Sequence, residues 1–236
     1  MNKVGKAIEA CWLGIATLVP LAMVPESWSI GFIEGPKVFV LRSFALLLVL
    51  LLSLEWARQP IVANETASSI SVAKLRESLV NTSKRLRHQP IAMAATAVAA
   101  VTILSTALSP VANASVFGID PGRDSYGLFS IASYLIVFGA VATHLRTGAQ
   151  LRRLIWALTI SSIMLGLYGI PQHFGFDTML TAPLPQPRVS LTFGNPVFAG
   201  SYLLMTIPLT LALWQAWHIR YNALAHVGIG AVLIAA

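Results

Sequence analysis

Charged residues are scarce in this sequence. Only 11% of its 236 residues are Asp, Glu, Lys or Arg, whereas 56% are hydrophobic. Soluble globular domains carry about 25% charged residues, so this composition excludes an ordinary water-exposed domain. Apolar runs of this extent need lipid around them, and they predict an all-α protein that forms a polytopic transmembrane helical bundle.

Cysteine is also nearly absent, and the histidines are scattered. Cys11 is the single cysteine, so neither an internal disulfide nor a Cys-x-x-Cys site can form. The five histidines are never paired at metal-ligand spacing, and the sequence lacks HExxH, GxSxG and a glycine-rich phosphate loop. We therefore predict no metal and no cofactor for this portion of the protein.

Acidic residues are few as well. Nine Asp and Glu stand against 16 Lys and Arg, which gives a formal net charge of +7. Such an excess could serve nucleic-acid binding, but here the basic residues occupy the gaps between apolar runs, as they do in membrane proteins. The charge therefore predicts membrane topology, and we expect no nucleic acid as a partner.

Long apolar runs are what the sequence has in abundance. A membrane-spanning helix needs about 20 mostly apolar residues. Six segments meet this requirement, and a further run starts near residue 223; the six are 7–25, 36–56, 90–109, 127–145, 153–171 and 196–217. We expect one transmembrane domain over 1–236 with six complete spans and a truncated seventh, and we expect the chain to be incomplete at its C-terminus.

The basic residues between the runs predict the orientation. With a cytoplasmic N-terminus, twelve of them fall on the cytoplasmic side: Lys3, Lys6, Arg58, Lys74, Arg76, Lys84, Arg85, Arg87, Arg146, Arg152, Arg153 and Arg220. The opposite side keeps four: Lys37, Arg42, Arg123 and Arg188. This is the positive-inside pattern of a multi-pass protein of the cytoplasmic (inner) membrane.

The basic connection 57–89 is either an amphipathic helix resting on membrane lipid or a solvated loop.

The first long connection on the outer side carries one candidate binding residue. Pro121 and Gly122 predict a turn that presents Arg123. This arginine serves either an external ligand or a local ion pair with Asp120 and Asp124.

The second long outer connection, 172–195, places Arg188 just before S-L-T-F-G-N-P. Asn195 is a favoured N-cap, and Pro196 suits the first helical position. The free amides of residues 197–199 would then face outward, and a helix N-terminus beside an arginine can hold a phosphate. The same features also fit a well-capped membrane helix that binds no ligand.

Three pieces of the chain carry a family resemblance. They are GIDPGRDSYGLFSIASY, LRRLIWALTISSIMLGLYGIPQHFGFD and RVSLTFGNPVFAGSYLLMTIPLTLALW. In this order they resemble the family of O-antigen ligases and O-antigen polymerases, whose members carry the T-F-G-N-P element of the third piece. The resemblance implies a glycosyltransferase of lipopolysaccharide or cell-surface polysaccharide biosynthesis. Such an enzyme moves a glycan from undecaprenyl pyrophosphate to an acceptor on the outer face of the cytoplasmic membrane, without a metal. It also implies pyrophosphate binding by Arg188, Arg123, Asn195 and Gly194.

The sequence departs from that family at two points. Val197 stands where the family has a second asparagine, and the external loop with the family's histidine would lie beyond residue 236. No catalytic residue is therefore assigned in this chain.

The alternative function is a non-catalytic membrane subunit that packs against membrane protein partners. A transporter for a small anion is a third possibility, but no ionisable residue lies near the middle of a predicted span, where a transporter usually has one.

Overall fold

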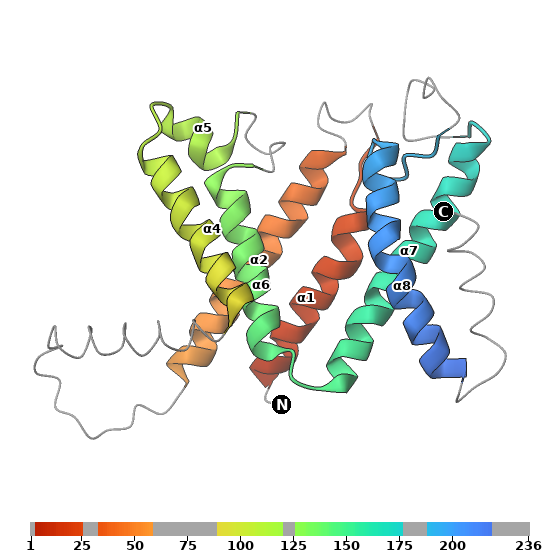
Figure 1. Ribbon diagram of the computed structural model, residues 1–236, viewed down its shortest axis with the longest axis horizontal. Coiled ribbons are helices and arrows are strands. Elements are labelled where there is room, and N and C mark those ends of the chain that lie inside the picture. The colour runs from red at the N-terminus through yellow and green to blue at the C-terminus, as the bar shows by residue number, and fades with distance from the viewer. Residues whose placement is uncertain (1–2, 26–32, 59–88, 120–125, 177–187, 219–236) are drawn as a thin grey trace, which may run out of the picture.

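The computed structural model describes residues 3–25, 33–58, 89–119, 126–176 and 188–218, and the regular structure in these ranges is helical throughout. Seven helices make it up: α1 (Lys3–Leu21), α2 (Glu34–Ala57), α4 (Pro90–Ala107), α5 (Ala112–Phe117), α6 (Leu128–His144), α7 (Gly148–His173) and α8 (Pro196–His218). The six long helices lie side by side as a bundle (Figure 1). The predicted all-α helical bundle is confirmed.

Successive long helices alternate in direction (Figure 1). Each helix therefore begins at the end of the bundle where the preceding long helix finishes. We call the end where α1 begins the lower end, and the end where α1 finishes and α2 begins the upper end. Within the bundle α1 packs against α2, α6 and α7, while α8 packs on α7 and α4 on α6. α2 and α8 both begin at the upper end, where α1 finishes (Figure 1).

Each of the six predicted spans overlaps one helix. By length and composition α1, α2, α4, α7 and the part of α8 over Pro196–Ala216 are long and apolar enough to cross a membrane. The fourth predicted span corresponds to α6, a shorter apolar helix of 17 residues. The predicted seventh run and most of the basic connection 57–89 lie outside the described residues.

Three of the predicted boundaries are displaced by four or five residues. α1 covers Lys3–Leu21 rather than 7–25, so Lys3 and Lys6 lie in its first turn. α7 begins at Gly148 rather than at 153 because a capping box starts it there. The N–H of Gln150 donates to Thr147 Oγ1 at 3.2 Å, and the N–H of Thr147 donates to Gln150 Oε1 at 3.1 Å. The two arginines that follow are therefore on the helix rather than in a loop.

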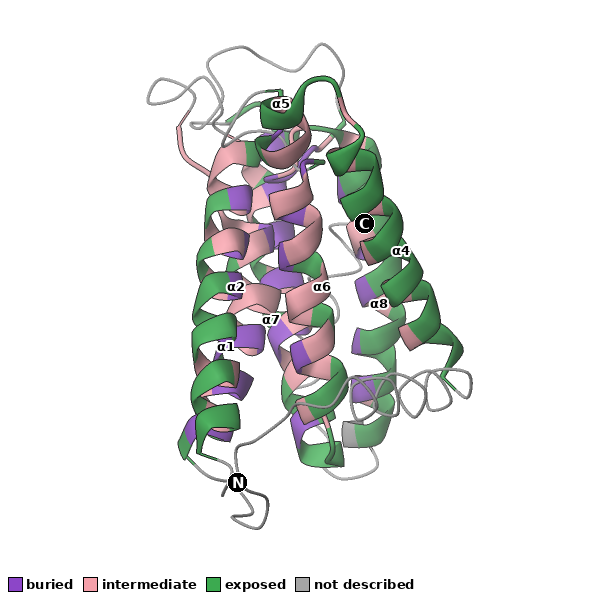
Figure 2. Cartoon of the chain, turned by 90° about the vertical axis from the view of Figure 1, so that its left-hand side faces the viewer, coloured by how far each residue is buried: buried purple, intermediate pink, exposed green. Residues whose placement is uncertain are grey.

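The bundle buries a narrow core and exposes much of its apolar surface. Ile8 and Trp12 of α1 pack with Leu48 of α2 and Ala140 of α6. In contrast, α4 buries no residue and is exposed along its length (Figure 2). Soluble monomers rarely expose apolar surface this extensive, but helices in contact with lipid do so as a rule.

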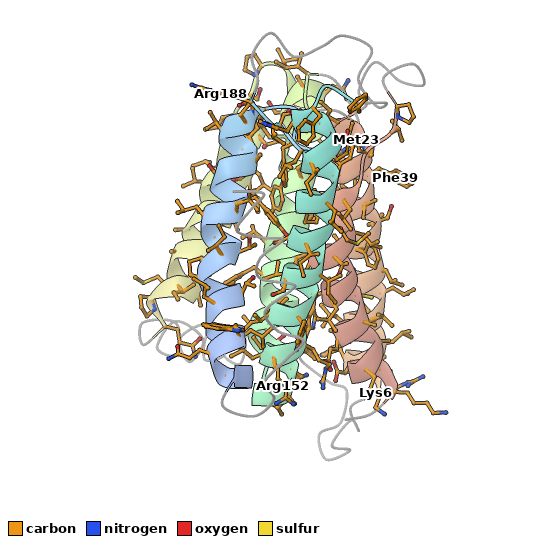
Figure 3. The ribbon with its side chains drawn as sticks, turned by 90° about the vertical axis from the view of Figure 1, so that its right-hand side faces the viewer. Lys6, Met23, Phe39, Arg152 and Arg188 are labelled. Carbon is orange, nitrogen blue, oxygen red and sulfur yellow. The ribbon has the colours of Figure 1, made fainter. Side chains whose placement is uncertain are left out.

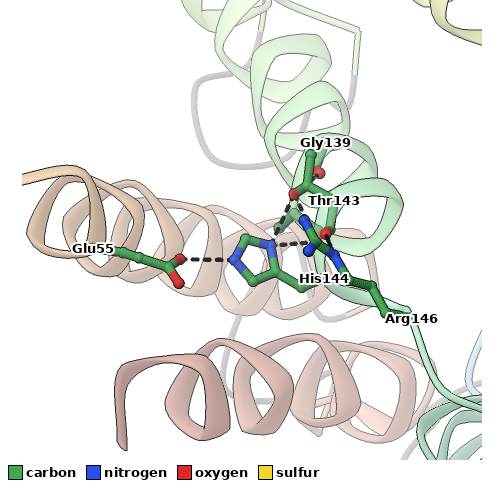
Figure 4. Close-up of polar contacts among 6 residues, drawn as sticks. Glu55, Gly139, Thr143, His144 and Arg146 are labelled. Atoms are coloured by element: carbon green, nitrogen blue, oxygen red, sulfur yellow. Dashed lines mark hydrogen bonds and ion pairs between the residues drawn. The ribbon is translucent and has the colours of Figure 1, made fainter. Parts of the chain in front are cut away.

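Ionisable side chains join the helices at the lower end. Arg153 Nε of α7 donates to Oε1 of Glu9 on α1 at 2.5 Å. Glu55 Oε2 of α2 lies 2.8 Å from Nε2 of His144 on α6 (Figure 4). These two contacts fix α1 to α7 and α2 to α6, so that the lower ends of four helices are held by polar pairs.

Candidate functional site

The segment that leads into α8 is held by the side chain of Gln172, near the end of α7. Gln172 Oε1 accepts from the backbone N–H of Ser190 at 2.9 Å and from that of Leu191 at 2.7 Å. Its Nε2 donates to Ser190 Oγ at 3.3 Å and to the Leu191 carbonyl at 3.4 Å. Gln172 and Ser190 are both buried, and a buried amide with its donors and acceptors satisfied fixes the chain that it binds. The backbone at residues 190–191 is therefore anchored to α7.

The next residue of the turn, Thr192, is tied to the end of α1. Its hydroxyl donates to the carbonyl of Pro20, which lies in the last turn of α1. It also accepts from Nζ of Lys37, in the first turns of α2, at 3.2 Å. One buried threonine thus joins the turn to two helices that precede it by more than 150 residues.

Lys37 completes this junction. Its Nζ donates to the carbonyls of Pro20 at 3.0 Å and Ala22 at 2.8 Å, both at the C-terminus of α1. It also lies 5.1 Å from the centre of the Phe193 ring, within the range of a cation–π interaction. A cation is favoured at a helix C-terminus, where the last carbonyls lack partners and the helix dipole is negative. The Lys37 ammonium therefore makes its hydrogen bonds within the protein, and we assign it a structural role rather than ligand binding.

Gly194 closes the turn in a conformation that suits glycine. Its φ is 68°, and a Cβ at this position would overlap Cδ1 of Ile33, the residue just before α2. L-residues avoid this left-handed region, and here the space is also filled. Gly194 therefore lets the turn pass close to the start of α2.

Asn195 caps α8 as predicted, and the helix begins at Pro196. Asn195 Oδ1 accepts from the N–H of Val197 at 2.9 Å, and its carbonyl accepts from Phe198 and Ala199 at 3.1 Å each. The prediction that the amides of residues 197–199 are free is thus wrong, because the cap residue itself engages all three. α8 offers a ligand the positive end of its dipole but not those amide hydrogens.

Arg188 lies just before the anchored turn in the sequence. Its side chain is exposed and lies at the upper end of the bundle, at the start of α8 (Figure 3). Arg188 precedes Ser190 by two residues, and the backbone of Ser190 is held by Gln172. The position of the Arg188 backbone is therefore restricted. The other predicted arginine, Arg123, lies outside the described residues.

A second arginine at the upper end serves the packing of α2 on α6. Arg42 Nη2 donates to Ser130 Oγ at 2.8 Å, and its guanidinium lies 4.9 Å from the centre of the Phe129 ring. This arginine therefore links two helices away from the turn, and we leave it out of the candidate site.

The arrangement suits anion binding rather than a complete reaction. An exposed guanidinium beside the N-terminus of a helix attracts phosphate and carboxylate groups. His173, at the end of α7, is exposed and packs edge-on against the Phe174 ring at 5.3 Å, and it has no described contact with the turn. Among the described residues, no group of three His, Cys, Asp or Glu could hold a metal ion. The described site thus supplies groups that can bind an anion.

Replacing Thr192 with valine tests the junction by stability. The change keeps the shape but removes the hydroxyl that joins Pro20 and Lys37. We expect it to lower the free energy of unfolding by about 1.5 kcal/mol, since the Pro20 carbonyl loses one of its two side-chain donors and Lys37 loses an acceptor. Thr192→Ser keeps the hydroxyl and should stay within about 0.5 kcal/mol of wild type. Unfolding by SDS in mixed micelles measures both, and equal stabilities of the two variants would contradict the assignment.

Comparison with known proteins gives no match: no family model, no curated protein and no solved structure matches this chain. The functional conclusion therefore depends on the residues and geometry described above.

Proposed function

We propose that this chain is the donor-binding part of an O-antigen ligase-like glycosyltransferase. In this proposal the upper end of the bundle faces the outside of the cytoplasmic membrane and receives a glycan carried on undecaprenyl pyrophosphate. The observation that supports it most is the exposed Arg188 at the start of a T-F-G-N-P turn that is anchored to α1, α2 and α7. A flexible loop would not need three anchors, whereas a phosphate-binding arginine gains from a fixed backbone.

The proposed chemistry makes the pyrophosphate the group to be stabilised. An acceptor hydroxyl adds to the anomeric carbon of the glycan, the bond from that carbon to the phosphate oxygen breaks, and undecaprenyl pyrophosphate leaves with its added negative charge. The fork of Arg188 would bind the phosphate oxygens where this charge develops. Asn195 would donate from Nδ2, because its Oδ1 is engaged by Val197. Gly194 contributes its backbone conformation, and a base from outside the described residues takes the acceptor proton.

The distribution of charge supports the proposed orientation. The described basic residues of the lower end are Lys3, Lys6, Arg58, Arg146, Arg152 and Arg153, whereas the upper end has Lys37, Arg42 and Arg188. Cytoplasmic ends of membrane proteins are enriched in Lys and Arg. This bias favours a cytoplasmic lower end and an outer location for Arg188.

A second candidate function is a non-catalytic membrane subunit. α4 buries no residue, and α8 contacts a single helix, α7, within the described part of the chain. Both helices therefore leave apolar surface that partner helices could cover. This reading assigns no ligand to Arg188.

Deletion of the gene distinguishes the two functions. If the chain belongs to the transferase, cells without it should accumulate lipid-linked glycan and lose the glycan-bearing acceptor, and the complete wild-type gene should restore the product. Electrophoresis of the acceptor and extraction of the lipid-linked glycan measure both pools. Unchanged acceptor glycosylation in the deletion strain would reject the transferase.

A further inference from the structure

The lower ends of α1 and α7 bring together basic side chains that nearby carboxylates do not neutralise. The described carboxylates of this end are Glu9 and Glu55, and each is engaged, with Arg153 and His144 respectively. Lys6 and Arg152 are exposed and lie at the end of the bundle opposite Arg188 (Figure 3). Neither makes an ion pair with a residue that the structure describes.

Arg153 is the centre of this group. Its Nε donates to Glu9 at 2.5 Å, and Glu9 is buried, but half of the arginine side chain is exposed. The terminal nitrogens of the guanidinium are thus available to a further acceptor. Lys6 precedes Glu9 by three residues, and such residues are neighbours on a helix surface. Arg153 therefore binds Glu9 within one helical turn of Lys6, and Arg152, the residue before Arg153, adds a third cation at this end of the bundle (Figure 3).

These cations lie close to the lower ends of their helices. At 1.5 Å per residue, Lys6 and Arg153 lie about 5 Å and about 8 Å along their helices from the lower ends. Both α1 and α7 begin at this end, so their dipoles add positive potential there. Phosphate groups of the adjacent leaflet would meet these side chains at the boundary between headgroups and acyl chains.

An apolar stripe on α7 continues from Arg153 toward the upper end. Ile160, Met164 and Leu167 follow it at intervals of seven, four and three residues, and they are 46%, 50% and 55% exposed. This spacing places all four residues on one face of the helix. A cation at one end of an exposed apolar stripe matches a phospholipid, with its phosphate at the arginine and an acyl chain along the stripe.

We infer that the lower end of the α1–α7 pair is a binding site for an anionic phospholipid. Lys6, Arg152 and Arg153 bind the headgroup phosphate, while Ile160, Met164 and Leu167 contact an acyl chain. Glu9 holds Arg153 in place, so the site keeps a net positive charge that favours an anionic over a zwitterionic headgroup. The inference is independent of the proposed glycan transfer.

Lipid-dependent thermal stability of the purified full chain in detergent tests this site. Phosphatidylglycerol should raise the unfolding midpoint, and phosphatidylcholine with the same acyl chains should raise it much less. The double variant Lys6→Gln/Arg152→Gln should weaken the apparent affinity for phosphatidylglycerol about fivefold for each cation removed. Both side chains are exposed, so the variant should keep the midpoint of the lipid-free protein.

Arg58→Gln is the matched control, because Arg58 is an exposed arginine at the lower end of α2, outside the site. It should leave the affinity within about twofold of wild type. Equal stabilisation by the two lipids would overturn the inference. An effect of Arg58→Gln as large as that of one site cation would do the same, since the lipid would then respond to total charge. Equal stabilisation by inorganic phosphate at matched ionic strength would show that no lipid is required.

Discussion

Replacing Arg188 with alanine is expected to lower glycan transfer by on the order of a hundredfold or more, which abolishes it in a cellular assay. Enzymes lose about this much activity when one preorganised group that stabilises developing charge is removed, and we propose that Arg188 is such a group. Arg188 is exposed and lies outside the anchored positions 190–195, so the variant should insert into the membrane and unfold like wild type. The measurement is the amount of glycan-bearing acceptor in a deletion strain that expresses each variant.

Two variants separate the role of Arg188 from a general effect of charge. Arg188→Lys keeps the positive charge but loses the planar fork, and we expect it to retain part of the activity, about a tenth of wild type. Arg58→Ala removes an exposed arginine from the opposite end of the bundle and should leave transfer unchanged. If Arg188→Ala transfers glycan at the wild-type rate, Arg188 does not belong to the donor site.

The second large effect is expected from Gly194→Val. Valine would be forced into the left-handed region at a φ of 68°, and its Cβ would overlap Ile33. Backbone strain and overpacking each cost about 1–3 kcal/mol, so we expect a loss of about 4 kcal/mol of unfolding free energy. Because the turn carries Arg188 at its start, glycan transfer should fall together with stability.

Gly175 provides a matched control for this substitution. Its φ is 79°, but a Cβ there would meet no atom of the described residues within 4 Å. Gly175→Val should therefore cost only the strain, about 2 kcal/mol. Adding Ile33→Ala to Gly194→Val should restore part of the lost stability, because the two side chains compete for one space. Equal costs for the two glycine variants, without rescue by Ile33→Ala, would show that the close approach to Ile33 does not matter.

Local sequence signals predicted the parts of this structure that depend on local physics. The apolar runs give the helices, and Asn195 with Pro196 gives the start of α8, because capping depends on neighbouring residues. The same local reasoning went wrong for the amides of residues 197–199. It assumed that these N–H groups stay free beside the cap residue. In the structure the side chain and the carbonyl of Asn195 accept hydrogen bonds from all three.

The junction around the turn was not predictable in this way. From the sequence, Lys37 was predicted only to be one of four basic residues on the outer side. Its partner Thr192 lies 155 positions away in the chain. Gln172 belongs to one of the pieces that carry the family resemblance, but nothing in its neighbourhood shows that its amide binds residues 190 and 191. Such contacts depend on which helix ends meet, which the packing of α1, α2 and α7 decides.

The central claim is that the upper end of the bundle binds a lipid-linked pyrophosphate for glycan transfer. Its most direct test is the release of undecaprenyl pyrophosphate from a lipid-linked glycan in proteoliposomes that contain the complete protein and an acceptor. We predict that release matches the formation of glycan-bearing acceptor one for one, and that Arg188→Ala stops both. Absence of release from active wild-type preparations, or release that is the same in Arg188→Ala, would contradict the account.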